Sequence, residues 1–431
     1  MTTLEATPRT AGARLVGEAR GPGLDLEAHL RHHGALALPE RYSSSWADWL
    51  LGEIERSGLT GRGGAGFPAH RKLRLVQAAG GRPVVLVNAM EGEPASAKDR
   101  FLLGFAPHLV LDGAEVVARA LDAEEIVLCF PDDRLGIGRH LAQVLSERSA
   151  AGMASTPVAL VALAGRYIAG EESALAAGVA GRPARPRYRP DKSVPLRTGR
   201  REAVVHNVET LAHVALIARH GAGWFREVGT SEAPGTCLVT ISGAVERPGV
   251  VELAVGTPIG RIVELAGPTG TVQAVLVGGY GGSWVSHDEL AVPYAPRELA
   301  TFGASMGAGV LVVLPLESCG IRETERIARF MAAESAGQCG PCVFGLAAIA
   351  DDLRALADGA TGSEGFDRLV RHCAVVDGRG ACRHPDGVVR LARSALRVFA
   401  TDVASHRRGV PCAGSARSSL LVLPPFDPGR R

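Results

Sequence analysis

The chain has 431 residues, 46% of them apolar, and a formal net charge of +2. This length predicts about three domains, and the apolar fraction is ample for their cores. No stretch reaches the ~18 apolar residues that span a membrane, and the N-terminus lacks the apolar core of a signal peptide. The near-neutral charge gives no electrostatic case for nucleic acid. We therefore expect a cytoplasmic protein with no membrane span and no nucleic-acid partner.

Residues 1–40 are polar and rich in Gly and Arg, and we expect them to be poorly ordered. Between residues 41 and 232, apolar residues alternate between the spacing of helices and that of strands. Helices are expected from Ser45 to Gly58 and at 109–121 and 135–147, and strands at 83–87, 126–130 and 158–164. Such alternation predicts a mostly parallel sheet covered by helices.

The stretch from Gly58 to Pro68, GLTGRGGAGFP, holds five glycines in eleven residues. Glycine adopts positive φ angles and lies against a ligand with no Cβ in the way, so consecutive N–H groups here could hold an anion. Arg62 would add a planar guanidinium for a phosphate. The stretch is neither a Walker loop, because no Gly-Lys-Ser/Thr follows, nor a Rossmann fingerprint, because no strand leads into it. The alternative is a flexible surface loop.

Polar residues follow the strand at 83–87, in the segment from Asn88 to Pro94, NAMEGEP. Open α/β sheets bind ligands at the carboxyl ends of their strands, which makes this segment a candidate site. Residues 181–201 hold four Pro and seven Arg without a period. We expect them to form an extended loop that wraps the surface, the alternative being a disordered solvated stretch.

Short strands replace the alternating pattern near residue 235. Strands at 237–241 and 250–253 flank the turn signal Glu246-Arg247-Pro248-Gly249 and predict a hairpin, a short helix begins at Thr257-Pro258, and a strand returns at 274–277. From about 320 to 412, four segments have helical spacing, which indicates a small bundle, and 413–431 form a tail.

Six of the eight cysteines lie after position 318, and this uneven clustering favours metal binding over disulfides. These cysteines are Cys319, Cys339, Cys342, Cys373, Cys382 and Cys412.

Several motifs together resemble the NADH-binding flavoprotein subunit of respiratory complex I (the F subunit of NADH–quinone oxidoreductase) and its relatives in NAD-linked hydrogenases and formate dehydrogenases. They are GLTGRGGAGFP, NAMEGEP, the stretches Tyr167–Glu172 and Val205–Thr210, and the C-terminal third. The resemblance implies an α/β fold class: a Rossmann-like FMN-binding domain at 41–232, a small β-grasp (SLBB-like) domain at 235–316 and an iron–sulfur-binding four-helix bundle at 320–412. It also makes 181–201 a lid over the nucleotide site.

The resemblance implies the following residues around FMN and NAD(H): Gly61, Arg62, Gly63, Gly64, Ala65, Gly66, Phe67, Lys72, Asn88, Glu91, Glu93, Tyr167, Gly170, Glu171, Glu172, His206 and Asn207. Glu93 and Glu172 would be catalytic, and with Phe67 they match positions that hold the remainder of NADH while it stacks onto FMN. The alternative for each Glu is a surface carboxylate, and for His206 a core histidine.

Four positions depart from the family pattern. Where the family has Trp, Asp, Phe and Asn, this chain has, in the same order, Leu73, Met90, Lys192 and His206. Losing an aromatic stack costs on the order of 1 kcal/mol, so the resemblance supports FMN more strongly than NAD(H).

The iron–sulfur motif also departs from its pattern. The family has E-S-C-G-x-C-x-x-C with a fourth Cys further on, whereas this chain has ESAGQCGPC, so that Cys339, Cys342 and Cys382 remain and Ala336 replaces one ligand. A 4Fe–4S cluster normally takes four Cys. Three outcomes are open: a cluster with another ligand, Cys373 or Cys319 being the nearest candidates, a 3Fe–4S cluster, or no cluster.

The resemblance implies a protein that takes a hydride from NADH onto FMN and passes single electrons through an iron–sulfur site to a separate protein, such as a ferredoxin. One alternative is a flavin or ferredoxin reductase that lacks the cluster. Another is a non-catalytic scaffold that docks partners through its β-grasp domain.

Overall fold

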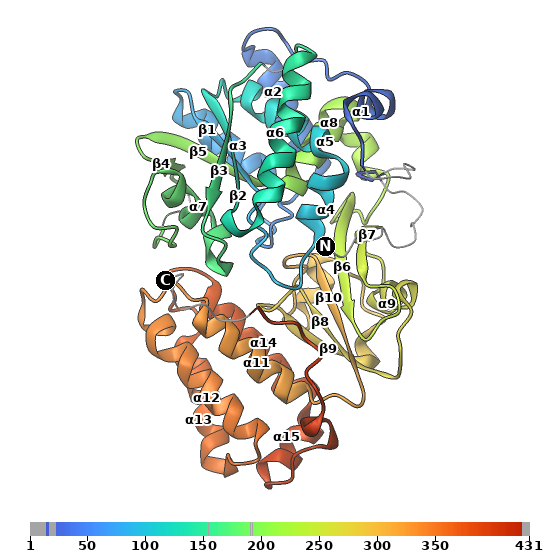
Figure 1. Ribbon diagram of the computed structural model, residues 1–431, viewed down its shortest axis with the longest axis vertical. Helices are drawn as coiled ribbons and strands as arrows, with labels where there is room; N and C mark the ends of the chain where they lie inside the picture. Colours follow the sequence, from blue (N-terminus) through green and yellow to red (C-terminus); the bar gives the residue numbers. More distant parts are fainter. Residues whose placement is uncertain (1–13, 17–22, 154, 190, 192, 425–431) are drawn as a thin grey trace.

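The computed structural model describes residues 14–16, 23–153, 155–189, 191 and 193–424. Figure 1 shows three parts: a sheet covered by helices at the top, a second sheet below it, and a group of long helices beside that second sheet. The first part comes from the N-terminal half of the chain and the helical part from its C-terminal end.

The first sheet is mostly parallel, as the alternating pattern predicts. Its strand order is β3-β2-β1-β5-β4, and only the edge strand β4 is antiparallel. The strands are β1 (Val84–Asn88), β2 (Glu125–Pro131), β3 (Val158–Leu163), β4 (Leu196–Thr198) and β5 (Arg201–Asn207). In register, Asn88 at the end of β1 lies opposite Asn207 at the end of β5, so the polar ends of two central strands meet at one edge.

Helices pack on both faces of this sheet. They are α1 (Leu26–His33), α2 (Ser44–Ser57), α3 (Ala69–Ala79), α4 (Lys98–Phe105), α5 (Pro107–Ala120), α6 (Leu135–Ala150), α7 (Glu172–Val179) and α8 (Val208–Arg226), with short 3-10 turns η1 (Asp132–Arg134) and η2 (Tyr167–Gly170). The cap of α2 is Ser43 rather than Ser45, and Gly58 ends the helix in the left-handed conformation, φ 73°. Gly113 permits the closest approach of α5 to α8, because a Cβ there would lie 1.9 Å from the carbonyl oxygen of Leu211.

The expectation of poor order up to residue 40 is wrong for residues 26–33, which form α1. Asp25 caps α1, and His29 on this helix is buried and bonded to Asp112 of α5 at 2.8 Å. Burying that polar pair anchors the helix, although its composition looks like that of a loop. Residues 1–13 and 17–22 of the same stretch lie outside the described residues.

The second sheet is mixed, with strand order β7-β6-β10-β8-β9. Its strands are β6 (Thr236–Gly243), β7 (Gly249–Ala254), β8 (Val272–Val277), β9 (Ser283–Ser286) and β10 (Val310–Pro315), accompanied by α9 (Ile259–Ala266), α10 (Pro296–Ala300) and η3 (His287–Glu289). The predicted hairpin is confirmed, since Ile241 of β6 pairs with Gly249 of β7. The pairing of β6 with β10 is parallel and the other pairings are antiparallel.

The C-terminal helices are α11 (Gly320–Ala333), α12 (Leu346–Ala357), α13 (Gly362–Val376), α14 (His384–Val398) and α15 (Ala400–Arg407), with the π-helical turn η4 (Pro341–Gly345) and the 3-10 turn η5 (Ala413–Ala416). The first four correspond to the four predicted helices, whereas α15 was not predicted. These helices share a core with the mixed sheet: Trp284 of β9 packs edge-on against Phe399 and donates from Nε1 to Thr324 Oγ1 at 2.9 Å.

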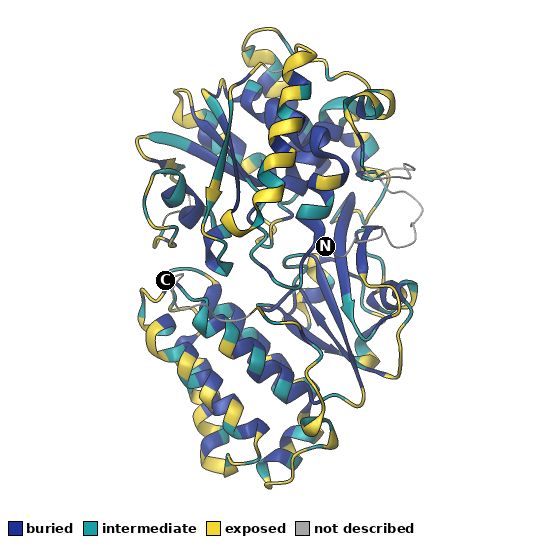
Figure 2. Cartoon of the chain, in the orientation of Figure 1, coloured by how far each residue is buried: buried dark blue, intermediate teal, exposed yellow. Residues whose placement is uncertain are grey.

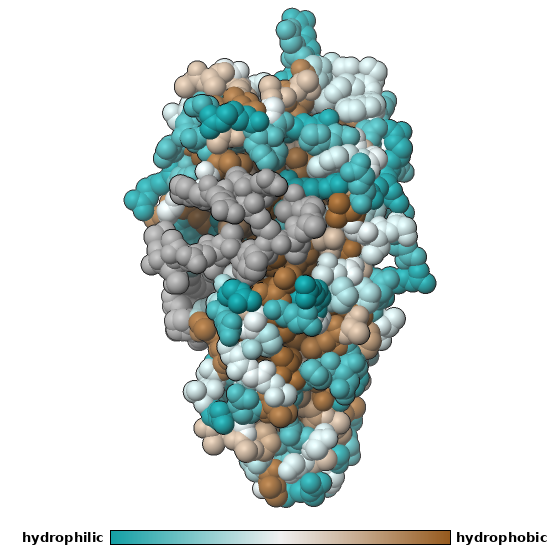
Figure 3. Space-filling view, turned by 90° about the vertical axis from the view of Figure 1, so that its right-hand side faces the viewer, coloured by the Kyte–Doolittle hydropathy of each residue, from teal (hydrophilic) through white to brown (hydrophobic). Residues whose placement is uncertain are grey.

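Figure 2 shows the strands of both sheets largely buried, whereas exposed residues gather on the outer side of α6 and of the long C-terminal helices. On the face turned to the viewer in Figure 3, apolar residues form a narrow band flanked by hydrophilic ones, as far as the grey residues leave it visible. Among the described helices, none alone is long and apolar enough to cross a membrane; α4 and α5 meet that test only together, across a 96° bend.

Of the Arg-rich segment 181–201, the described residues contain β4 and the first residue of β5 and otherwise no helix or strand. It contacts two distant places: the Arg187 amide donates to Ser173 Oγ at 2.8 Å, and Gln338 Nε2 donates to the Pro186 carbonyl at 3.0 Å. These contacts agree with the expected extended course along the surface. Lys192 of this segment lies outside the described residues.

Candidate functional site

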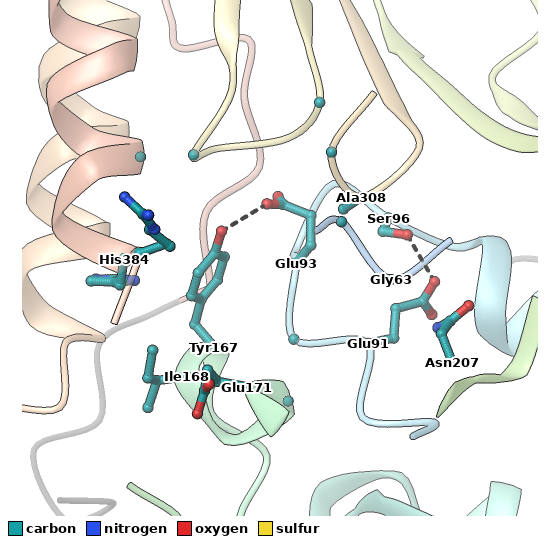
Figure 4. A pocket seen from close by; sticks show the side chains of 18 of the residues that line it. Gly63, Glu91, Glu93, Ser96, Tyr167, Ile168, Glu171, Asn207, Ala308 and His384 are labelled. Atoms are coloured by element: carbon teal, nitrogen blue, oxygen red, sulfur yellow. Dashed lines mark hydrogen bonds between the residues drawn. The ribbon is translucent and has the colours of Figure 1, made fainter. Parts of the chain in front are cut away.

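A cavity of about 310 Å³ lies where the three parts meet. This volume falls within the range of small-molecule and cofactor sites, roughly 300–1,000 Å³. Figure 4 shows Gly63, Glu91 and Glu93 on one side and Tyr167, Ile168 and Glu171 on η2 and its end, with His384 of α14 beyond them. Of the residues predicted from the sequence, those that line the cavity are Arg62, Gly63, Gly64, Asn88, Glu91, Glu93, Tyr167, Gly170, Glu171, Asn207 and Cys382.

The register of β1 and β5 explains why two asparagines stand together here. Asn88 Nδ2 donates to the Gly170 carbonyl at 2.9 Å, which ties the end of β1 to η2. Asn207 caps α8 by accepting from the Glu209 amide at 3.0 Å, and its Nδ2 donates to Asp99 at 2.6 Å. The fold therefore holds both side-chain amides in a fixed orientation, in which a bound ligand would meet them.

The Gly-rich loop closes on itself through the Gly61 amide, which donates to the Phe67 carbonyl at 2.8 Å. Gly64 has φ 111° and Gly66 φ 61°, conformations that favour glycine. Among the described residues, no acceptor lies within hydrogen-bonding geometry of the Gly63 and Gly64 amides, which line the cavity. Unpaired amides at a cavity wall fit an anionic group.

The Arg62 side chain differs from its predicted role as a phosphate fork. It is buried and donates to the carbonyl oxygens of Thr236 at 3.1 Å and Pro234 at 3.5 Å. Its amide donates to Thr210 Oγ1 at 2.9 Å. Because both carbonyls bond Nη2, Arg62 joins the Gly-rich loop to the start of β6. Its Nε has no hydrogen-bond partner among the described residues, and Arg62 lines the cavity.

Lys98 is a second buried cation in the cavity lining. Its Nζ lies 2.6 Å from Asp99 Oδ1 and 2.9 Å from Glu209 Oε2. Burial alone would lower the pKa of Lys98, but the two carboxylates outweigh burial and raise it. The ammonium therefore stays charged at the cavity wall. The sequence offered one hint of it, since only three lysines occur and Lys98 lies just after the NAMEGEP motif.

Glu91 is held by donors on α4 and before it. It accepts from Ser96 Oγ at 2.9 Å and from the Asp99 amide at 2.8 Å (Figure 4 draws the first). Burial, followed by the Asp99 charge, raises its pKa. Its φ of 32° is unusual for a residue other than glycine, and such backbone strain is common at functional sites.

Glu93 reaches across the cavity to the mixed sheet. One carboxyl oxygen accepts from the Tyr280 amide at 2.9 Å and from the Tyr167 hydroxyl at 3.4 Å, and the other accepts from the Ala95 amide at 3.2 Å. Burial raises the pKa of Glu93 to about 7, although the three donors oppose that rise. Glu93 can thus hold or release a proton near neutral pH.

Seven of the residues predicted around FMN and NAD(H) lie outside the cavity lining: Gly61, Ala65, Gly66, Phe67, Lys72, Glu172 and His206. Lys72 pairs with Glu172, and its Nζ lies 5.9 Å from the centre of the Phe67 ring. His206 is buried within β5, where burial and then the Lys72 charge lower its pKa to about 3. It is therefore neutral, as the core-histidine alternative holds.

Three thiols of the predicted metal site are neighbours. Burial opposes ionisation of Cys339, but the amides of Ala381 and Cys342 outweigh it and lower the pKa of this thiol. Burial raises the pKa of Cys342 to about 12, and the nearby Cys339 and Cys382 thiols add to the effect. Cys382 also lines the cavity, so the thiol group and the cavity share a wall.

Of the two candidates for a replacement ligand of Ala336, Cys319 does not join these thiols. It lies with His406 and Cys412 at the opposite end of α11. Cys373 is buried on α13 in the hydrophobic core that also contains Cys342.

The segment before Cys339 is fastened to η2. Glu334 accepts from the Tyr167 amide at 3.0 Å, and Arg166 donates to the Ser335 carbonyl at 3.2 Å. Tyr167 therefore contacts Glu93 through its hydroxyl and the thiol-bearing segment through its amide.

Sequence reasoning missed the residues that the mixed sheet and the C-terminal helices bring to the cavity. They are Gly278, Gly281, Ser305, Gly307, Ala308, Met331, Arg383, His384, Gly387 and Arg390. His384 donates from Nε2 to the Met331 carbonyl at 2.8 Å, and its ring lies 5.4 Å from the Tyr167 ring. No local motif marks these residues, because they converge only when the three parts pack.

Comparison with known proteins identifies relatives of the chain. Residues 54–216 match the family Complex1_51K, the Nuo51 FMN-binding domain, and residues 322–406 match the NADH-ubiquinone oxidoreductase-F iron-sulfur binding region. The chain is 32% identical over 387 residues to an F subunit (numbered 2) of the NADH-quinone oxidoreductase of Rhizobium meliloti (strain 1021), a match that covers 86% of this chain and 92% of that protein. It is 29% identical over 418 residues to the F subunit of the NADH-quinone oxidoreductase of Streptomyces coelicolor, covering 94% and 90%.

Among solved structures, a chain in the crystal structure of an NAD+-reducing [NiFe]-hydrogenase in the H2-reduced state superimposes with a TM-score of 0.80 at 29% identity. The match covers 94% of this chain and 68% of that one. With an FMN-binding domain, an iron–sulfur binding region and this extent of identity, the chain belongs to the family of F subunits of NADH-quinone oxidoreductase.

Proposed function

We propose that the chain is a flavoprotein subunit that oxidises NADH and passes the electrons through an iron–sulfur site to a partner protein. The observation that carries this proposal is the shared wall: one cavity is lined both by the Gly-rich loop and by Cys382. The names of the relatives, F subunits of NADH-quinone oxidoreductase and an NAD+-reducing hydrogenase, support the same interpretation.

FMN would lie between the Gly-rich loop and the Asn88–Glu93 segment. The amides of Gly63 and Gly64 would receive its phosphate, and Lys98 would supply positive charge nearby. Asn88 and Asn207 would hold polar atoms of the flavin in place, since their own contacts already fix them. When bound, FMN supplies the chemistry, because it accepts a hydride and releases electrons one at a time.

NAD(H) would enter from the side of Glu93, Tyr167 and Glu171. In our proposal Glu93 is the group that holds or moves a proton at its carboxyl, with the Tyr167 hydroxyl as its donor. Lys72, Glu172 and Phe67 lie next to one another outside the cavity, and we propose them as contacts for the remoter part of the dinucleotide.

The iron–sulfur site would use three thiolates, from Cys339, Cys342 and Cys382. Amide donors to Cys339 favour its ionised form, which is the form that binds iron. Ala336 offers no ligand atom, so we propose a site with three cysteine ligands and an iron count below that of a four-cysteine cluster. The same substitution favours the second candidate, a flavin reductase that has lost the cluster.

The electron acceptor would dock next to η4. Val343 and Phe344 of this turn are 47% and 75% exposed, directly after Cys342. Large exposed apolar side chains beside a redox centre suit a contact with another protein. We further propose that the mixed sheet at 235–316 is the β-grasp (SLBB-like) domain and a structural or docking unit, and that the protein is cytoplasmic.

The test is an anaerobic purification followed by flavin, iron and sulfide analysis, on the wild type and two single variants. We expect FMN in all three samples, with iron and sulfide lost in Cys382→Ser and kept in the control Cys373→Ala. Flavin without iron in the wild type would favour the cluster-free reductase. A wild type that binds no added FMN would favour the scaffold and overturn the proposal.

A further inference from the structure

A second group of metal-ligating side chains lies away from the cavity. Among the described residues, Cys319, His406 and Cys412 are the one set of three His, Cys or acidic side chains whose ligand atoms all lie within 4.8 Å of one another. Cys319 precedes α11, whereas the ESAGQCGPC motif follows that helix. Fourteen helical residues span about 21 Å, so this group is a separate site from the three thiols near the cavity.

The separations within the group are those of ligands around one ion. Cys319 Sγ lies 3.8 Å from His406 Nε2, Ser415 Oγ lies 3.5 Å from the same nitrogen, and Cys412 Sγ lies 3.6 Å from Ser415 Oγ. A tetrahedral zinc site with Zn–S near 2.3 Å and Zn–N near 2.0–2.1 Å places neighbouring ligand atoms about 3.3–3.8 Å apart. Three of the six separations among two thiols, an imidazole and a hydroxyl therefore lie within this range.

The surrounding contacts orient these ligands. His406 donates from Nδ1 to the Leu356 carbonyl at 3.1 Å, which leaves Nε2 as the unprotonated ring nitrogen. Such a carbonyl partner is the usual support of a metal-binding histidine. In this structure the Cys412 amide donates to Nε2 at 3.0 Å, so an incoming ion would take the place of that hydrogen bond.

The backbone holds the two cysteine segments together. A Cβ on Gly414 would lie 2.6 Å from the Cys319 amide nitrogen, so the turn η5 is pressed against the start of α11. Cys319 and His406 are buried and Cys412 is half-buried, which leaves an approach for an ion from the side of η5.

From this geometry we propose a structural zinc site formed by Cys319, His406 and Cys412, with Ser415 Oγ, or a water that it holds, in the fourth position. Zinc suits the donor set, because it binds thiolate and imidazole together in tetrahedral sites. The proposal does not depend on the flavin or on the iron–sulfur site.

The site would anchor the C-terminal segment. After η5 the chain runs back over α11: the Leu420 amide donates to Glu323 at 2.7 Å, and Arg326 donates to the Leu421 carbonyl at 3.1 Å. Tyr280, the cavity neighbour that donates its amide to Glu93, also bonds the Val422 carbonyl at 3.1 Å. A metal bound by Cys319, His406 and Cys412 would therefore hold the start of the segment 413–422, and residue 422 of this segment contacts Tyr280 beside the cavity.

The experiment uses the full chain, purified with a thiol reductant and loaded with Zn2+ or Co2+. We expect one His406-dependent metal ion per chain, and with Co2+ the visible absorption of a tetrahedral ion together with thiolate-to-cobalt charge transfer. Cys412→Ser and His406→Gln should lose this ion and its spectrum. Cys339→Ser, which alters only the other thiol group, should keep both.

Cobalt titration of the wild type answers the question even if His406→Gln does not fold. A wild type without tetrahedral cobalt absorption would overturn the proposal. So would zinc content that is unchanged in Cys412→Ser, or a Cys319–Cys412 disulfide that persists in the reduced, metal-loaded protein.

Discussion

Replacing Glu93 by Gln removes a carboxyl whose buried position makes the stability of the chain depend on pH. Its pKa is raised from 4.5 to about 7. Because the raised value favours the protonated form in the folded chain, this contribution to stability is complete below about pH 4.5 and is lost as the pH rises through about 7. The difference of about 2.5 pKa units, at 1.36 kcal/mol each, gives about 3 kcal/mol.

The assay is urea unfolding of the FMN-free protein between pH 4.5 and 8.5, followed by tryptophan fluorescence. The free energy of unfolding of the wild type should fall, relative to Glu93→Gln, by about 3 kcal/mol over this range and then level off above pH 7. A constant offset between the two proteins is expected from altered hydrogen bonds and does not affect the slope. Exposed Glu246→Gln is the control and should follow the wild type. Parallel curves for the wild type and Glu93→Gln would refute the buried, titrating carboxyl.

Three further substitutions test other parts of the structure. Gly113→Ala would place a Cβ 1.9 Å from a carbonyl oxygen of α8, so we expect the free energy of unfolding to fall by about 3 kcal/mol, or the protein to be insoluble. The control is Gly104→Ala, which has open space around the new Cβ and should stay near the wild type in thermal unfolding. Ala336→Cys would restore a fourth thiol, and we expect about one more iron per chain by metal analysis and a changed electron paramagnetic resonance spectrum. An unchanged iron content would contradict this expectation. Tyr167→Phe removes a hydroxyl donor that lowers the pKa of Glu93, so the midpoint of the Glu93 titration, read by carbon-13 NMR, should move to higher pH.

Apolar runs located β1 and β2 because strands buried on both faces carry few polar residues. An apolar run also located β3, although this edge strand is mostly half-buried. The strand β5 has only three consecutive apolar residues, Ala203–Val205, and gave no comparable pattern although it lies beside β1 in the sheet. The helix α1 was hidden by its polar composition, since its stability comes from the buried His29–Asp112 contact.

The residues of the candidate site also fall into those that the sequence could predict and those that it could not. Residues near the ends of β1 and β5 could be predicted, because strand ends are local features and the motifs there are distinctive. The role of Arg62 could not, since the carbonyls that capture its guanidinium belong to residues 234 and 236. The contribution of His384 and of the Cys319 group required knowledge of how the bundle packs, which local sequence does not contain.

The central claim is that this cavity brings NADH to a flavin held by the Gly-rich loop. The most direct measurement adds NADH to the FMN-loaded chain without oxygen and follows the flavin absorption band. We predict rapid bleaching in the wild type and in Cys382→Ser, with transfer of electrons to an added one-electron acceptor protein slowed in the variant. Flavin that binds but keeps its full absorption in excess NADH would contradict the account.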